Sequence, residues 1–128
     1  MTTTAPSTAR HALAPAELPV LLTALGLMFV HTLDEAFGHP EPGGTTNAVT
    51  VVVVAAVLAI VYRRLPRVWR AILLVVLGLD AAVQGVLGHV SHIVMGDAVA
   101  LDYTGVLFAA GGVMLLWLAV NVFRATRR

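Results

Sequence analysis

Residues 49–78 read VTVVVVAAVLAIVYRRLPRVWRAILLVVLG, and this stretch decides the fold. Two apolar runs flank the segment RRLPR at residues 63–67, where charge and proline indicate a break between two elements. Valine-rich runs favour strands in water, but lipid requires every backbone group to be paired within the chain. A helix meets that requirement locally, so the stretch predicts two membrane-spanning helices joined by a short basic turn.

The composition of the whole chain agrees with a membrane protein. Of 128 residues, 59% are hydrophobic and 12% are charged, and the mean hydropathy is +0.89. A soluble domain carries about 25% charged residues, and one of this size could not bury so much apolar surface. High hydropathy, a net charge of +1 and the lack of cysteine exclude a disordered chain, a nucleic-acid-binding protein and a disulfide-stapled secreted module.

Four segments are long and apolar enough to cross the hydrocarbon core, which takes about 20 residues as a helix. They are residues 18–37, 47–62, 68–95 and 103–123. Short connections imply antiparallel neighbours, so we expect an all-α, compact bundle of four antiparallel transmembrane helices. The predicted organisation is a disordered cytoplasmic tail at 1–16, a transmembrane domain at 17–124 and a basic cytoplasmic tail at 125–128.

The arginines predict the orientation. The chain has eight arginines and no lysine. They occur before the first span, between the second and third, and after the fourth, whereas the other two connections hold only acidic charges. By the positive-inside rule both termini are cytoplasmic, which predicts a multi-pass protein of the cell membrane.

Ionisable residues occur inside two of the predicted spans, where each costs about 2.5–3.5 kcal/mol on insertion scales and is a candidate for function. The first span contains His31, Asp34 and Glu35, and the third contains Asp80, Gln84, His89 and His92. At 1.5 Å per residue, His31 and His89 both lie outward of the middle of their spans. The two groups are therefore predicted to share one layer in the outer half of the bilayer.

The spacing of these residues places them on defined helix faces. His31, Asp34 and Glu35 are three or four residues apart and lie on or beside one face. His89 and His92 continue a stripe of small residues, which permits close helix contact and leaves room for imidazole rings. The stripe comprises Gly78, Ala82, Gly85, His89, His92 and Gly96. Asp80, Gln84 and Ser91 are expected on a different side of the same helix, where Asp80 and Gln84 bond a neighbouring helix or form a proton or ion relay.

Imidazole and carboxylate groups in a dry layer are typical of a transition-metal site for zinc, iron or copper. The predicted ligands are His31, Glu35, His89 and His92, with Asp34 and Glu35 as catalytic carboxylates. Two other interpretations stay open. One is haem held between His31 and His89. The other is a structural network of hydrogen bonds and ion pairs, for example Glu35 with a protonated His89.

The segment His31-Thr32-Leu33-Asp34-Glu35 resembles the H-x-x-E-E membrane proteins, small multi-span bacterial proteins named for that motif in their first helix. Aspartate stands here in place of the first glutamate of the motif. The resemblance implies that His31, Asp34 and Glu35 act together, and that the membrane is the inner membrane of a bacterium. It implies no activity.

Three functions are compatible with these observations. The first is a membrane-embedded metal-dependent enzyme or metal-binding protein with a lipid-like or small-molecule substrate. The second is a proton- or ion-coupled transporter or channel subunit that also uses Asp80 and forms a homo-oligomer, because four helices enclose little space. The third is an assembly subunit, without catalysis, whose polar groups only specify helix packing.

Overall fold

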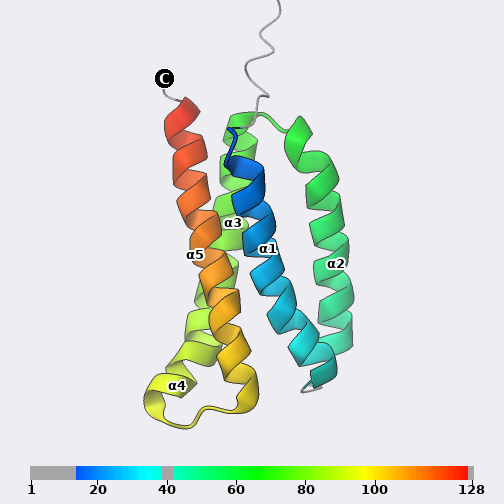
Figure 1. The fold of residues 1–128 in the computed structure, drawn as a ribbon, viewed down its shortest axis with the longest axis vertical. Coiled ribbons are helices and arrows are strands. Elements are labelled where there is room, and N and C mark those ends of the chain that lie inside the picture. Colours follow the sequence, from blue (N-terminus) through cyan, green and yellow to red (C-terminus); the bar gives the residue numbers. More distant parts are fainter. Residues whose placement is uncertain (1–13, 39–41, 127–128) are drawn as a thin grey trace, which may run out of the picture.

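The computed structural model describes residues 14–38 and 42–126, so most of the predicted N-terminal tail and part of the first connection lie outside the described residues. All regular elements in these ranges are helical (Figure 1). They are α1 (Glu17–Leu33), η2 (Asp34–Gly38), α2 (Gly44–Val61), η3 (Tyr62–Arg64), α3 (Arg67–Gly85), η4 (Val86–Val90), α4 (Ser91–Met95) and α5 (Ala100–Thr126).

These elements form four continuous helical segments long and apolar enough to cross a membrane, which confirms the predicted all-α architecture. The segments are Glu17–Gly38, Gly44–Arg64, Arg67–Met95 and Ala100–Ala125. Each begins or ends a few residues beyond the predicted span. Successive segments run in opposite directions, so the two ends of the described chain lie at the same end of the molecule (Figure 1).

Two of the long segments change from α- to π-helix near the end that is far from the arginines. The first π-turn, η2, contains Asp34 and Glu35. The second, η4, contains His89 and joins α3 to α4. A π-turn adds one residue to a helical turn and occurs often at functional sites. The irregular backbone therefore coincides with the two groups of polar residues that the sequence singles out.

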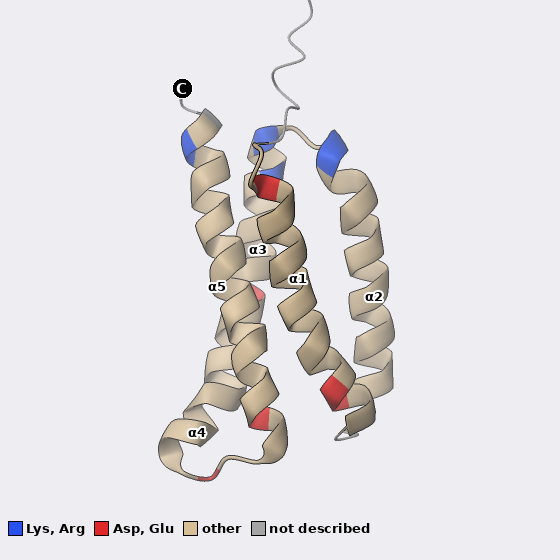
Figure 2. Cartoon of the chain, viewed as in Figure 1, with Lys and Arg blue, Asp and Glu red and all other residues tan. Residues whose placement is uncertain are grey.

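The arginines of the described chain gather at the opposite end, as Figure 2 shows. There Arg70 is fully buried and its Nη1 donates a hydrogen bond to Glu17 Oε1 (2.7 Å). Tyr62 Oη donates to the same oxygen (2.8 Å), and the Ala14 amide donates to Glu17 Oε2 (3.0 Å). We call Glu17, Tyr62 and Arg70 the buried ion-pair cluster. It ties α1, η3 and α3 together beside the apolar core.

Small residues let α3 and α5 approach closely, as the predicted stripe requires. A Cβ on Gly85 would meet backbone atoms of Ala109 at 2.6 Å, and one on Gly78 would meet the Gly112 carbonyl oxygen at 2.9 Å. Glycine is needed at these positions because the facing backbone occupies the space of a side chain. Close approach of this kind is how helices associate in lipid.

Helix α2 is the least closely packed of the four long helices of the bundle. α5 packs closely against both α3 and α1, whereas α2 contacts mainly α1 and η2 (Figure 1). Only Gly44, Ala48 and Leu58 are buried within α2. Its valine side chains need no protein partner, since short apolar residues on every face are as compatible with lipid as with a core.

Candidate functional site

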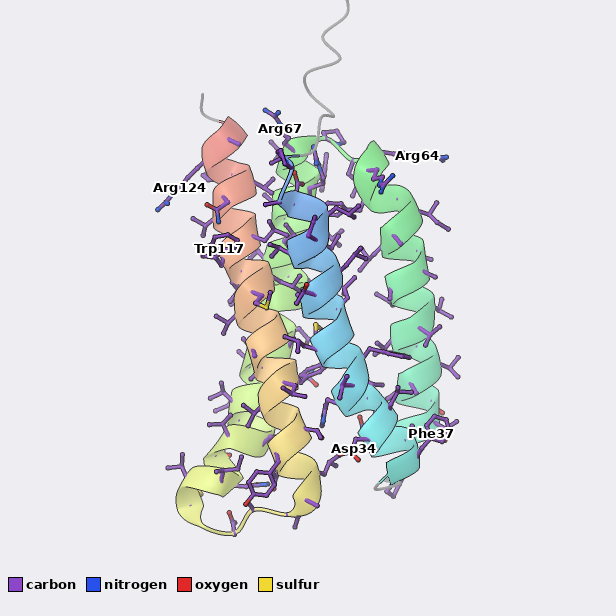
Figure 3. All side chains as sticks on the ribbon, viewed as in Figure 1. Asp34, Phe37, Arg64, Arg67, Trp117 and Arg124 are labelled. Atoms are coloured by element: carbon purple, nitrogen blue, oxygen red, sulfur yellow. The ribbon has the colours of Figure 1, made fainter. Side chains whose placement is uncertain are left out.

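A polar cavity of about 610 Å³ lies in the half of the bundle away from the arginines. Its size is within the range of about 300–1,000 Å³ typical of ligand pockets. Figure 3 shows Asp34 at this end, far from Arg64, Arg67 and Arg124. The polar side chains that line the cavity come from α1, η2, α2, α3 and η4, and they are His31, Thr32, Glu35, Asn47, Thr50, Asp80, Gln84 and His89.

The histidines of the first and third segments meet beside this cavity. The ring centroids of His31 and His89 are 4.6 Å apart, with the rings edge to face. His31 is 5% exposed, and the side chain of His89 is 21% exposed. Gly105 of α5 provides the room, because a Cβ there would overlap the ring of His89. This contact agrees with the expectation that His31 and His89 lie at a similar distance along their helices.

Thr104 of α5 links His31 to Asp34. Its hydroxyl donates a hydrogen bond to Asp34 Oδ2 (2.7 Å), and His31 Nδ1 lies 3.1 Å from the same hydroxyl. The same hydroxyl also lies 3.0 Å from the Leu101 carbonyl oxygen, and because this oxygen and an ionised carboxylate can only accept, the hydroxyl oxygen accepts from His31. This assigns the hydrogen of the neutral ring to Nδ1. Nε2 of His31 has no hydrogen-bond partner among the described residues.

Asp102 of α5 holds His89, and His92 lies beside it on the outside of the cavity. Its Oδ1 lies 2.9 Å from His89 Nδ1 and 3.4 Å from His92 Nδ1, while its Oδ2 accepts from the Val99 amide (2.8 Å). The acceptor-only partner again assigns Nδ1–H to His89 and leaves Nε2 as the acceptor of the neutral ring. Asp102 is 2% exposed, so it is the buried charge about which His89 and His92 are arranged.

Glu35 and Asp80 also line the cavity, but their hydrogen-bond partners are neutral amides. Asn47 Nδ2 donates to Glu35 Oε1 (2.9 Å), and Gln84 Nε2 donates to Asp80 Oδ1 (2.7 Å). The structure pairs His89 with Asp102. The alternative that the sequence suggested, an ion pair between Glu35 and His89, is not formed.

Asp80 and Gln84 are expected on a different side of the helix from the histidines, and both are exposed whereas His89 packs against Gly105 of α5. Asp80, Gln84 and His89 line the same cavity. The π-turn at Val86–Val90 gives the physical reason, since one extra residue in a turn changes the direction of the following side chains by about 100°. A strict 3.6-residue period does not include that change.

The four predicted metal ligands contact different partners and do not converge on one point. His31 and His89 are in contact, but Glu35 bonds Asn47, and His92 lies beside Asp102 and does not line the cavity. Within residues 14–38 and 42–126, no group of three or more His, Asp or Glu side chains is arranged to hold a metal ion. The metal site and the catalytic roles of Asp34 and Glu35 stay predictions.

Sequence reasoning missed three residues that hold the site together, Asp102, Thr104 and Asn47. Asp102 was assigned to a connection because hydropathy falls there, although an acidic residue in the first turn of a helix is a recognisable N-terminal signal. Thr104 and Asn47 carry no charge, and nothing in the sequence distinguishes them from other small polar residues near a helix end.

Comparison with protein-family models, curated proteins and solved structures finds no match for this chain.

Proposed function

We propose that this chain is an integral membrane protein that binds a small molecule in the polar cavity and exchanges protons with it, as a subunit of a proton-coupled transporter. The observation that carries the proposal is the pair of histidines. His31 and His89 both line the cavity, and the Nδ1 atom of each is engaged by a partner on α5. In a neutral ring held in this way, Nε2 is the atom that takes up a proton.

The carboxylates support proton uptake by both rings. Asp102 contacts His89 directly, and Asp34 is joined to His31 through Thr104. A carboxylate beside the Nδ1–H of an imidazole fixes the ring and stabilises the imidazolium that forms when Nε2 is protonated.

Four apolar helices of sufficient length support insertion in the cell membrane, and the resemblance at residues 31–35 favours the inner membrane of a bacterium. With the arginine end in the cytoplasm, the cavity would lie in the outer half of the bilayer. A cysteine in place of Asp97, between α4 and α5, tests this orientation. It should react with a membrane-impermeant maleimide from outside, and a cysteine in place of Arg64 only from inside; the opposite pattern would reverse the proposed topology.

Proton movement can be measured with purified protein in liposomes that contain a pH-sensitive dye. A potassium gradient with valinomycin sets the membrane potential, and small cationic, neutral and anionic compounds are added in turn. At least one class should trigger proton movement, and the double variant His31→Gln/His89→Gln should slow it about a hundredfold or more. His92→Gln is the matched control, since His92 does not line the cavity.

Two outcomes would overturn the proposal. One is that no class of compound triggers proton movement, and the other is that the double variant moves protons as fast as the unchanged protein. Nitrogen NMR of histidine-labelled protein in nanodiscs gives an independent check on the ring assignment. We expect an unprotonated Nε2 for His31 and His89 in the neutral state. The reverse tautomer would remove the physical basis of the proposal.

A further inference from the structure

The polar cavity continues into an apolar crevice of about 510 Å³ between α1, α2 and α3. The crevice exists because α2 stands apart from the packed helices. Its lining is apolar for most of its length, with Leu22, Leu25 and Phe29 from α1 opposite Ala55 and Leu58 from α2. Thr50, Val51, Asp80 and Phe108 line both spaces, so the cavity and the crevice adjoin. Together they form one amphipathic site with a polar end and an apolar end.

The polar end has an excess of negative charge. Glu35 and Asp80 both line it, and the hydrogen-bond partner of each is a neutral side-chain amide. Neither carboxylate is in an ion pair within the described part of the chain, unlike Glu17 and Asp102. None of the five arginines in that part lines either space. A carboxylate in an apolar surrounding is stabilised when a cation enters beside it.

We propose that the occupant of this site is a cationic amphiphile, with a single hydrocarbon chain or apolar body in the crevice and an ammonium-type head between Glu35 and Asp80. Asp80 marks the boundary, because it lines both spaces. Phe108, which also lines both, offers a ring face to the cationic head. This inference rests on the proposed function and names its substrate class: the cation would be exchanged against protons taken up by His31 and His89.

The same observations disfavour other amphiphiles. An anionic head would meet two carboxylates with no arginine to receive it, which costs affinity through like-charge repulsion. A neutral head would leave both carboxylates without a compensating charge. A cation without an apolar body would leave the crevice unused and lose the free energy of burying hydrocarbon.

Equilibrium dialysis of the protein in nanodiscs, with empty nanodiscs subtracted, tests the inference with four probes. Dodecyltrimethylammonium should bind saturably. Tetramethylammonium lacks the chain, dodecanoate reverses the charge and dodecanol removes it, so each should bind at least about tenfold more weakly. Glu35→Gln and Asp80→Asn should each weaken binding of the cationic amphiphile about tenfold. Asp97→Asn is the matched control, since Asp97 is exposed and lines neither space.

A pair of glycine substitutions tests the apolar end. Gly26 lines the crevice, and nothing lies within 4 Å of the position of its Cβ, so the side chain of Gly26→Leu has room to enter the crevice. This substitution should weaken the binding of dodecyltrimethylammonium. Gly88 is equally open but lines neither space, so Gly88→Leu should leave binding unchanged.

The outcomes separate this inference from the proposed function. Equal binding of dodecanol or dodecanoate, or cation binding that is insensitive to both Glu35→Gln and Asp80→Asn, would overturn the cationic substrate class. The double variant of His31 and His89 should still bind the cation and lose only proton movement. If cation binding fails while another class of compound drives proton movement through the two histidines, the substrate class is wrong and the proposed function stands.

Discussion

Removing Glu17 should destabilise the protein more than any other single change at the arginine end. The Arg70 side chain is fully buried, and the side chain of Glu17 is 4% exposed. Breaking a buried ion pair by removing one partner costs about 3–5 kcal/mol. We expect Glu17→Gln to fall within this range. Arg70→Met should fall near its lower end, because Tyr62 and the Ala14 amide still donate to the carboxylate.

A double-mutant cycle measures the coupling between the two charges. In Glu17→Gln/Arg70→Met no buried charge is left without its partner, so the loss of stability should be about 1–3 kcal/mol smaller than the sum of the two single losses. Unfolding in mixed micelles with increasing sodium dodecyl sulfate, followed by circular dichroism, gives each free energy of unfolding. Arg64→Met is the control, since Arg64 is exposed, and should change stability by less than about 0.5 kcal/mol. Single losses below about 1 kcal/mol, or additive losses, would refute the reasoning.

Three further predictions concern the site. Gly105→Ala should lower the free energy of unfolding by about 1–3 kcal/mol, because the new methyl group has to displace the His89 ring. In the control Gly88→Ala the methyl group meets no atom, so thermal unfolding of the two variants should differ, and equal losses of stability would contradict the close contact. His89→Gln and Asp102→Asn should be coupled by at least about 0.5 kcal/mol in a double-mutant cycle, and additivity would mean that their 2.9 Å contact contributes nothing. Elemental analysis tests the predicted metal site: a full equivalent of zinc, iron or copper per chain that is lost in His89→Gln would support it, and less than one equivalent in the unchanged protein would contradict it.

The sequence predicts the four helices well because one requirement dominates. Each apolar run must pair its backbone groups within the run, which requires a helix. The apolar run at residues 68–95, for example, corresponds to the continuous helical segment Arg67–Met95. Hydropathy does not predict where each helix ends, since helix ends depend on local hydrogen bonds. The Asp102 carboxylate bonds the Val99 amide, and this contact lies in a stretch that hydropathy assigns to a connection.

The site is only half predictable. The contact between His31 and His89 agrees with their predicted depth, because two helices that run in the same direction place residues at similar distances along them in one layer. The partners of these rings are not predictable in the same way. Thr104 is 73 residues from His31, and Arg70 is 53 residues from Glu17, so their contacts depend on which helix faces which. The π-turns add a change of direction that a regular period does not contain.

The separation of α2 from the other helices has an evolutionary consequence. In the most apolar window of α2, 17% of the residues are buried, compared with 39% in α5. Lipid does not distinguish valine from isoleucine, leucine or alanine by shape, whereas a facing backbone distinguishes glycine from everything else. Homologous chains should therefore exchange aliphatic residues freely along residues 51–61. They should retain Gly105, Ala109 and Gly112 in α5, where substitution would separate two helices. Selection would preserve the hydropathy and length of α2, but the identity of individual small residues in α5.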